Sequence, residues 1–230
     1  MFKKGDFHIH SIASDGNCTS KEIVLLAKKR NVDIIALTDH NTTLGIDEAI
    51  LYGNEIGIKV IPGVELSTRY NSTKVHILGY FKDNSYKNEL LIEILKYIKT
   101  HKISEIKRIL GTYLNDDYRS NRLFVHEGIK ILRFFGATVV LAHPVLLSTQ
   151  DFINIIKMDF DGLEARYFSN TENDTEYFLK FADDNNLLYT AGSDFHNYNE
   201  LYRTHGLIGD VYLNEEEINA FLIKGNLQFV

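Results

Sequence analysis

Two histidines and an aspartate stand close together near the start of the chain, in the segment DFHIHSIASDG at residues 6–16. His8 and His10 flank a single isoleucine. Strand alternation puts such a pair on one side, so both rings can reach one metal ion. Asp15 either adds a carboxylate ligand or, because it precedes Gly16, simply forms a turn. An H-x-H pair alone is weak evidence for a metal, so the rest of the chain decides its meaning.

Histidines and carboxylates also recur at or near the ends of the other strands that the sequence predicts. In parallel α/β folds the carboxyl ends of the strands form the functional face. Burying so many acids and imidazoles without counter-charges would cost much free energy, and metal cations are the obvious compensation. We therefore expect a polynuclear site with nitrogen and oxygen ligands, which suits manganese, iron or zinc alike. Beyond the first strand, the residues concerned are Asp39, His40, Glu65, His76, His143, Glu164, Asp194 and His196.

Short apolar runs alternate with helix-like segments, which predicts an α/β fold with helices outside a parallel sheet, open or closed into a barrel. The helix expected at 19–31 begins with a capping box, since Glu22 stands three residues after Thr19. A glycine ends the helix expected at 45–57. Strands are expected at 6–10, 33–40, 58–67, 74–80, 138–144, 160–167 and 187–196, and further helices at 173–186 and 214–225.

The segment at about 86–135 interrupts this alternation, because its pattern is helical and richer in lysine. We interpret it as a helical insertion within a single domain that spans residues 1–230, a length that one α/β barrel often reaches. Charged residues at helical spacing usually form a solvated surface. The alternative is that some of them face a substrate phosphate, and the candidates are Tyr97, Lys99, Lys102, Lys107 and Arg108.

Composition narrows the classes of function. The net charge is −6 and the sequence pI is about 5.8, which argues against a broad basic surface for long nucleic acid. The sequence shows no pattern of a signal peptide or a membrane-spanning helix. A single cysteine, Cys18, excludes an intramolecular disulfide and is expected to be a loop thiol. We expect a cytoplasmic protein that acts on a small molecule, and the oligomeric state stays open.

Seven segments together resemble the PHP (polymerase and histidinol phosphatase) family of metal-dependent phosphoesterases. They are FHIHSIASDG, ALTDHNT, IPGVELS, VHILGY, LAHP, GLEAR and AGSDFH. They occur in the family's order and cover the chain apart from its helical middle. The resemblance implies a distorted seven-stranded (β/α) barrel with three divalent metal ions at the C-terminal ends of the strands. Asp15 is an aspartate where some relatives have histidine, which bears on the metal that one site prefers.

The resemblance also implies a ligand set. It assigns nine residues to three metal ions: His8, His10, Glu65 and Asp194 to the first; His76 and His143, with Glu65 as a bridge, to the second; and Asp15, His40 and His196 to the third. The remaining histidines fall outside this set. His101 and His126 are expected at the surface of the helical insertion, and the position of His205 near the site leaves its role undecided.

Such a cluster is expected to hydrolyse a phosphate ester through a metal-bound hydroxide, so no protein nucleophile is assigned. Arg166, two residues after Glu164, either grips a substrate phosphate or forms a surface salt bridge. Asp39 either orients a ligand ring or caps the segment that follows it. The expected substrate is a small phosphomonoester, a nucleotide or nucleoside bisphosphate. The alternatives are 5′-3′ exonuclease action on short oligonucleotides, hydrolysis of histidinol phosphate, and an inactive barrel that only binds metal or a partner.

Overall fold

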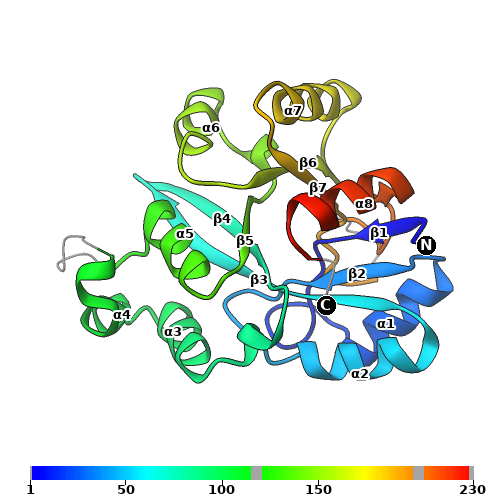
Figure 1. Cartoon of the computed structure of the whole chain (residues 1–230), viewed down its shortest axis with the longest axis horizontal. Coiled ribbons are helices and arrows are strands. Elements are labelled where there is room, and N and C mark those ends of the chain that lie inside the picture. Colours follow the sequence, from blue (N-terminus) through cyan, green and yellow to red (C-terminus); the bar gives the residue numbers. More distant parts are fainter. Residues whose placement is uncertain (1, 115–120, 199–204, 228–230) are drawn as a thin grey trace.

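The computed structural model describes residues 2–114, 121–198 and 205–227, and this part of the chain contains one curved sheet of eight strands (Figure 1). The strands lie in the order β7-β6-β5-β4-β3-β2-β1-β8. Their bounds are β1 Lys4–Asp6, β2 Ile34–Leu37, β3 Lys59–Tyr70, β4 Thr73–Tyr80, β5 Thr138–Leu141, β6 Gly162–Tyr167, β7 Leu188–Gly192 and β8 Leu213–Asn214.

The sheet nearly closes into a barrel, because the chain just after β1 bonds to the end of β7. The Phe7 amide donates to the Ala191 carbonyl, and the His10 amide donates to the Phe195 carbonyl, both at 2.9 Å. The predicted distorted α/β barrel is confirmed. The short strand β8 pairs antiparallel with β1 and adds an eighth strand to the seven expected. Two residues are too few to show the alternation by which a sequence reveals a strand.

The sheet is not parallel throughout, so the expectation of a wholly parallel sheet is wrong at β4. Strands β3 and β4 form an antiparallel hairpin, and β4 also runs antiparallel to β5. Only Asn71 and Ser72 connect β3 to β4, and Asn71 has a positive φ of 53°. A parallel partner would need a crossover of a dozen or more residues, whereas two residues suffice for a hairpin.

Helices cover the outside of the sheet. Thr19 and Glu22 form the predicted capping box, and Gly57 ends the second helix in the left-handed conformation with φ of 76°. The α-helices are α1 Ser20–Lys29, α2 Ile46–Ile56, α3 Glu89–Lys99, α4 Ile103–Leu110, α5 Val125–Phe134, α6 Thr149–Ile155, α7 Glu172–Asp184 and α8 Glu215–Lys224. Short 3-10 helices are η1 Asn84–Lys87, η2 Gly111–Tyr113 and η3 Pro144–Leu146.

Two apolar clusters hold this arrangement together. The larger one lies between the sheet and the surrounding helices, and the smaller one contains inward-facing strand residues such as Ile34, Leu78 and Tyr80. Helix α8 belongs to the smaller cluster, where the rings of Phe7 and Phe221 meet edge to face at 4.7 Å between centroids. Because α8 packs over the end where the strands begin, the end where they finish is left for a polar site.

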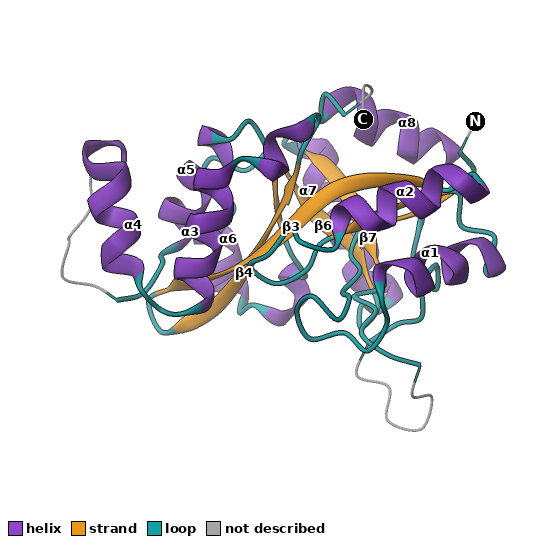
Figure 2. Ribbon diagram, turned by 90° about the horizontal axis from the view of Figure 1, so that it is seen from below, coloured by secondary structure: helices purple, strands orange, loops and turns teal. Residues whose placement is uncertain are grey.

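The predicted helical segment at 86–135 contains α3, α4 and α5, and its residues 115–120 lie outside the described part of the chain. These helices gather on the side of the molecule opposite to α1 and α2 (Figure 2). Helix α5 packs against β3, β4 and β5. A buried ion pair of 2.8 Å between Lys107 and Glu127 ties α4 to α5. Lys107 is therefore buried within the segment, and not aimed at a substrate.

Candidate metal centre

All nine predicted ligands converge where the parallel strands end. The first two follow β1, the next lies just after β2, and others come from the β3–β4 hairpin and from the loops after β5 and β7. Their nitrogen and oxygen atoms form overlapping groups that could each hold an ion. The groups are His8, His10 and Asp194; His40, Glu65 and His76; and His10, Asp15, His40 and His196. A further group joins Asp194 and His196 to His205, whose role was left undecided.

The most compact group surrounds Nε2 of His8 and Nε2 of His10, which lie 3.0 Å apart. Oδ1 of Asp194 is 3.3 Å from the first nitrogen and 3.1 Å from the second. The two carboxylate oxygens of Glu65 lie 3.4 Å from these nitrogens, one oxygen to each. Ligand atoms at such separations can share one ion at about 2.0–2.2 Å, the usual bond length to nitrogen and oxygen.

A second group shares the Glu65 carboxylate. Oε1 of Glu65 is 3.0 Å from Nδ1 of His76 and 3.2 Å from Nε2 of His143, and these two nitrogens are 3.2 Å apart. The three atoms form a nearly equilateral triangle. Because the same oxygen also faces His8, Glu65 stands between two groups, as a bridging ligand would.

The third group is wider and lies nearer the surface. Nε2 of His196 is 3.4 Å from Oδ1 of Asp15, and Nε2 of His40 is 3.7 Å from Oδ2. The Asp15 side chain is 52% exposed, whereas that of Glu65 is 1% exposed. Nδ1 of His40 also reaches Oε2 of Glu65 at 2.9 Å. The Asp15 group thus faces incoming solutes, and His40 connects it to the buried groups.

Several rings are held by hydrogen bonds on the side away from the cluster. Nδ1 of His8 lies 3.0 Å from Oε1 of Glu164, and Oε2 of Glu164 accepts the His143 amide at 2.8 Å. Nδ1 of His196 lies 2.7 Å from the Asp194 carbonyl oxygen. With a metal ion bound, Nδ1 of these two histidines would keep its proton in these contacts, and Nε2 would present its lone pair to the ion. Glu164 was visible in the sequence as a carboxylate at a strand end, but this orienting contact was not.

Asp194 has partners that sequence reasoning missed. Its Oδ2 accepts the Tyr167 hydroxyl at 2.8 Å and lies 3.0 Å from Nδ1 of His205. The His205 ring also packs on the His196 ring, with 4.0 Å between centroids. The only available signal for His205 was its closeness in sequence to the segment AGSDFH. Tyr167 and His205 therefore hold one oxygen of Asp194 while the other faces His8 and His10.

The backbone is strained where it delivers two of these side chains. His143 has φ of 29° and Asp194 has φ of 53°, values that residues with a side chain rarely adopt. Such strain concentrates at functional sites, where the surrounding structure maintains it. Gly192 is also constrained, because a Cβ there would collide with Cβ of His8 and Oε1 of Glu164. The close approach of β7 to His8 thus requires glycine.

Arg166 does not join the cluster. Strand alternation would put it on the same face as Glu164, but a bulge in β6 between the two shifts the register with β7. Tyr167, opposite Gly192, takes the inward position instead. Nη2 of Arg166 donates to Oε1 of Glu217 at 2.8 Å, and Arg166 lines a separate cavity of about 370 Å³. A role of Arg166 in substrate binding stays a prediction.

Asp39 has neither of its expected roles. Its carboxylate accepts the Ser11 amide at 2.7 Å and the Ser11 hydroxyl at 2.6 Å, and it also bonds the Ser14 hydroxyl. Asp39 therefore fixes the loop that presents Asp15, and among the described residues its carboxylate is hydrogen-bonded to serines and not to a ligand ring. Cys18 is buried in the same region and belongs to none of the ligand groups.

The charges of the cluster perturb one another strongly. Burial by itself lowers the pKa of His8, but the carboxylates of Glu164, Asp194 and Glu65 raise it well above the ordinary histidine value. Burial raises the pKa of Glu65, yet His76 and the other imidazoles hold it well below the ordinary value. Without a metal, protonated imidazoles neutralise the carboxylates. Metal ions and protons must therefore compete for the same imidazole nitrogens and carboxylate oxygens.

A buried polar atom without a partner supports this view. Within the described part of the chain, Oδ1 of Asp194, the atom that faces Nε2 of His8 and Nε2 of His10, accepts no hydrogen bond. Leaving such atoms unpaired is costly in a buried site, whereas a metal ion would satisfy acceptors of this kind. Imidazole nitrogen and carboxylate oxygen suit first-row divalent metals. The residues present fit metal ions.

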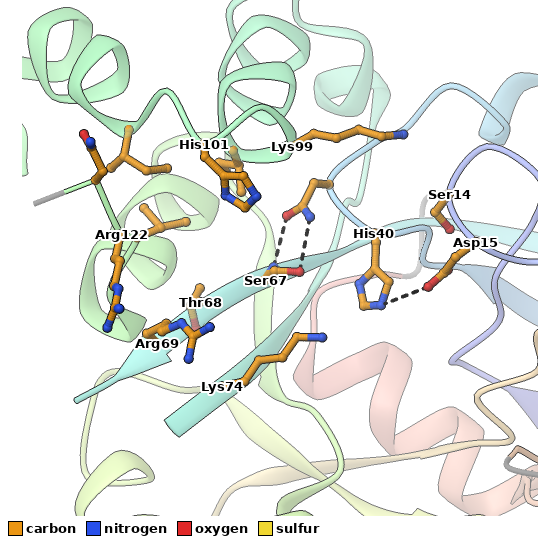
Figure 3. A pocket seen from close by; sticks show the side chains of 15 residues that line it. Ser14, Asp15, His40, Ser67, Thr68, Arg69, Lys74, Lys99, His101 and Arg122 are labelled. Atoms are coloured by element: carbon orange, nitrogen blue, oxygen red, sulfur yellow. Dashed lines mark hydrogen bonds and ion pairs between the residues drawn. The ribbon is translucent and has the colours of Figure 1, made fainter. Parts of the chain in front are cut away.

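Two cavities open beside these groups. One, of about 420 Å³, is lined by most of the predicted ligands together with Lys74, Tyr167 and His205. The other, of about 660 Å³, lies between the β3–β4 hairpin and the helical segment (Figure 3). Asp15, His40 and Lys74 line both, so the two cavities are neighbours that share a wall.

Comparison with known proteins agrees with the geometry. Residues 6–191 match the family model of the PHP domain. The chain belongs to the PHP family. It is 26% identical to a 5′-3′ exoribonuclease of Haemophilus influenzae over 85% of this chain and 91% of that protein. It is 40% identical to a 3′,5′-nucleoside bisphosphate phosphatase of Chromobacterium violaceum over only 32% of this chain and 26% of that protein.

A solved structure from Bifidobacterium adolescentis, of a predicted metal-dependent phosphoesterase, has the same fold, with a TM-score of 0.73, 24% identity and 96% of each chain covered. Family membership and the buried imidazole and carboxylate groups make this PHP protein a metal-dependent phosphoesterase, and so a hydrolase. Among the described residues, no helix has the length and apolarity needed to cross a membrane.

Proposed function

We propose that this PHP protein hydrolyses a small phosphomonoester, a nucleotide or nucleoside bisphosphate. The observation that supports this most is the pair of compact ligand groups that share Glu65 on the wall of an open cavity. Two relatives act on related compounds according to their names, an exoribonuclease and a nucleoside bisphosphate phosphatase. An acidic net charge of −6 agrees with a small substrate better than with long nucleic acid.

We infer that the site holds three divalent ions, manganese, iron or zinc. Nine residues would bind them: His8, His10, Glu65 and Asp194 the first, His76 and His143 with Glu65 the second, and Asp15, His40 and His196 the third. Such ions, when bound, lower the pKa of water and neutralise charge on the phosphoryl group. The separations between ligand atoms, 3.0–3.7 Å, support the first two sites as compact and the third as looser.

The residues of the cavity determine what kind of hydrolysis it supports. Its described lining contains no serine, threonine or cysteine, and its histidines and carboxylates are proposed metal ligands, so we expect water to be the nucleophile. Lys74 adds a positive charge at the rim, where it can contact a phosphate oxygen. Tyr167 and His205 keep Asp194 in place from outside the ligand group. Leu146 and Leu147 provide an apolar part of the wall.

A second candidate function is 5′-3′ exonuclease action on short oligonucleotides. The observation that favours it is the larger cavity of about 660 Å³ next to the metal groups, which offers room beyond one phosphate. Hydrolysis of histidinol phosphate has no comparable structural support. An inactive barrel would be expected to lack one or more ligands, and every predicted ligand is present.

The test is to purify the protein, load it with Mn²⁺, Fe²⁺ or Zn²⁺ and measure phosphate release from nucleotides, nucleoside bisphosphates, sugar phosphates and 5′-phosphorylated oligonucleotides. No turnover with any metal and ester would refute the enzyme proposal. The double variant His8→Ala, His10→Ala should lose activity, whereas His126→Ala, on α5, should retain it. Full activity in the double variant would refute the proposed site even if an activity were found.

A further inference from the structure

We propose that Asn41 is a positioning residue, which holds His40 beside Glu65 and thereby sets the affinity of the third metal site. This inference rests on the proposed function, because His40 and Glu65 are two of the proposed ligands. Asn41 directly follows His40 in the sequence, and its side chain is buried. In the described part of the chain, the Asn41 amide group bonds to Ser67 and not to a ligand ring, so it would act through the backbone that carries His40.

The segment that carries His40 lies outside the regular strands. Strand β2 ends at Leu37, short of this segment. Farther along, an isolated parallel bridge pairs His40 with Glu65. In this bridge the Glu65 amide donates to the Asp39 carbonyl at 3.2 Å, and the Asn41 amide donates to the Glu65 carbonyl at 2.9 Å. The bridge fixes the backbone of His40 against β3.

The side chain of Asn41 makes a hydrogen bond that the backbone of a longer strand would make. In a parallel ladder, the amide two residues after Glu65 would donate to the backbone carbonyl of residue 41. The Ser67 amide instead donates to Oδ1 of Asn41 at 3.0 Å, and Nδ2 of Asn41 donates to Oγ of Ser67 at 3.2 Å. Figure 3 draws both bonds at Ser67. The side-chain amide therefore takes the place of a peptide group and extends the pairing with β3 by one step.

Asparagine suits this position for two reasons. The backbone of Asn41 has φ of 51°, a left-handed conformation, at the point where the chain leaves β3 and continues to α2. Asparagine is one of the few residues with a side chain that tolerate this conformation. Its amide can also donate and accept at the same time. A residue without the amide would leave the Ser67 amide without its acceptor and free the chain from β3 directly after His40.

The position of His40 matters most for the third metal site. Nδ1 of His40 lies 2.9 Å from Oε2 of Glu65, and Nε2 of His40 lies 3.7 Å from Oδ2 of Asp15. His40 is therefore the third-site ligand that faces the carboxylate shared by the first two sites. The ligands that follow β1, β5 and β7 are carried by other strands. Loosening of His40 should weaken binding of the third ion and leave the first two nearly unchanged.

The experiment compares variants of the full chain that keep the backbone conformation and change the amide. Asn41→Gly retains a residue that adopts a positive φ readily, but it removes both side-chain bonds. Asn41→Asp keeps an acceptor for the Ser67 amide, and the Ser67 hydroxyl can donate to its second oxygen. The control is Asn186→Gly, because Asn186 has nearly the same φ, 52°, and is exposed in the turn before β7.

The measurement is calorimetric titration of metal-free protein with Mn²⁺, with bound Mn²⁺ counted by elemental analysis after gel filtration. Asp15→Asn identifies the binding phase of the third ion, because Asp15 is a proposed ligand of that ion alone. We expect Asn41→Gly to bind the third ion at least about tenfold more weakly than the wild type, the usual effect of removing a contact that orients a ligand, and the first two within about twofold. Asn41→Asp should bind the third ion within about threefold of the wild type, and Asn186→Gly should match the wild type for all three.

A second variant tests the same pairing from β3 if Asn41→Gly does not fold. Ser67→Ala removes the acceptor of Nδ2 and keeps the bond from the backbone amide to Oδ1. We expect about a threefold loss of affinity for the third ion, the effect of one neutral hydrogen bond. Unchanged affinity in this variant would then refute the proposal. Urea unfolding in EDTA measures the stability of each variant separately from metal binding.

Several results with Asn41→Gly would overturn the proposal. Equal weakening of all three ions would show a general loosening of the fold. Wild-type affinity for the third ion, whatever the stability in urea, would show that the amide at most stabilises the chain. An equal loss in Asn41→Asp would exclude the bond from the Ser67 amide as the cause. A wild type that binds fewer than three ions would remove the site that Asn41 is proposed to support.

The failure of the proposed function is distinguishable from these results. If the wild type binds three ions and Asn41→Gly loses affinity for the third, but no phosphate ester is hydrolysed, the role of Asn41 stands and the proposed reaction fails. If the wild type hydrolyses an ester and Asn41→Gly binds all three ions as the wild type does, the reaction stands and the role of Asn41 is refuted.

Discussion

Replacing Glu164 with glutamine tests how the metal centre holds its first histidine. Glu164 is fully buried, with Oε1 3.0 Å from Nδ1 of His8 and Oε2 accepting the His143 amide at 2.8 Å. A carboxylate in this place keeps the proton of His8 on Nδ1 and leaves Nε2 to bind metal. Glutamine has nearly the same shape, but it has one acceptor oxygen and turns an NH₂ group toward one of the two donors.

The magnitude follows from these two contacts. Loss of such an outer partner usually weakens metal affinity by about 10–100-fold, equivalent to about 1.4–2.7 kcal/mol. The donor left without an acceptor costs the metal-free protein about 1–3 kcal/mol in free energy of unfolding. Removing a buried negative charge works in the opposite direction, because a buried carboxylate is costly to desolvate. We therefore expect a clear loss of metal affinity and a smaller loss of stability.

The assay is calorimetric titration of metal-free protein with Mn²⁺, together with urea unfolding in EDTA. Glu127→Gln is a matched control, because Glu127 is also fully buried but pairs with Lys107 at 2.8 Å and belongs to no ligand group. Breaking that pair should lower the free energy of unfolding by about 3–5 kcal/mol and leave metal affinity unchanged.

Two results would contradict this reasoning. If Glu164→Gln binds Mn²⁺ as tightly as the wild type, the carboxylate does not orient His8. If Glu127→Gln loses as much affinity as Glu164→Gln, the effect reports general loosening of the fold and not the contact with the ring. A smaller effect in Glu164→Asp would add nothing, because the shorter side chain withdraws from both donors at once.

Three further predictions concern buried groups near the site. In Gly192→Ala the new Cβ collides with His8 and Glu164. The variant should therefore bind Mn²⁺ at least about tenfold more weakly and lose about 1–3 kcal/mol of free energy of unfolding in urea. Wild-type affinity and stability in this variant would contradict the close packing of Gly192 against His8. Since neighbouring carboxylates raise the pKa of His8 well above its ordinary value, its proton must leave when metal binds. Mn²⁺ affinity should therefore rise as the pH is raised through the neutral range, with measurable proton release, and a flat profile would refute this. Burial raises the pKa of the Cys18 thiol, so iodoacetamide should label the folded protein at least about tenfold more slowly than the unfolded chain at one pH, as mass spectrometry can measure.

The sequence was sufficient to name the residues that gather at the cluster because of two simple regularities. Ligand types are few, and the carboxyl ends of parallel strands meet at one end of a barrel. His8 and His10 were therefore expected to lie near Asp194, although His10 and Asp194 are 184 positions apart in the sequence. The structure brings all three residues within reach of one ion. Helix ends were equally accessible, since Thr19 and Glu22 determine a local hydrogen bond.

Long-range partners were less accessible, because residue type does not specify which neighbour a side chain meets. Glu164 could be placed at a strand end, but its contact with His8 spans 156 residues and depends on the closure of the barrel. His205 contacts Asp194 from a loop with no periodic pattern. The direction of β4 was also missed, because a hairpin turn of two residues looks like any other polar break in the sequence.

The bulge in β6 shows most clearly where sequence reasoning ends. A period of two assigns Glu164 and Arg166 to one face, and that is the basis for expecting a guanidinium beside the metal ions. One extra residue in the strand reverses the assignment, so that Tyr167 contacts Asp194 and Arg166 pairs with Glu217. The cations that face the neighbouring cavity come instead from the regular β3–β4 hairpin and the helical segment. Because Arg166 pairs with Glu217 outside the cluster, Arg166→Gln should leave Mn²⁺ affinity unchanged in a calorimetric titration, and a clear loss of affinity would contradict its place on the outer face.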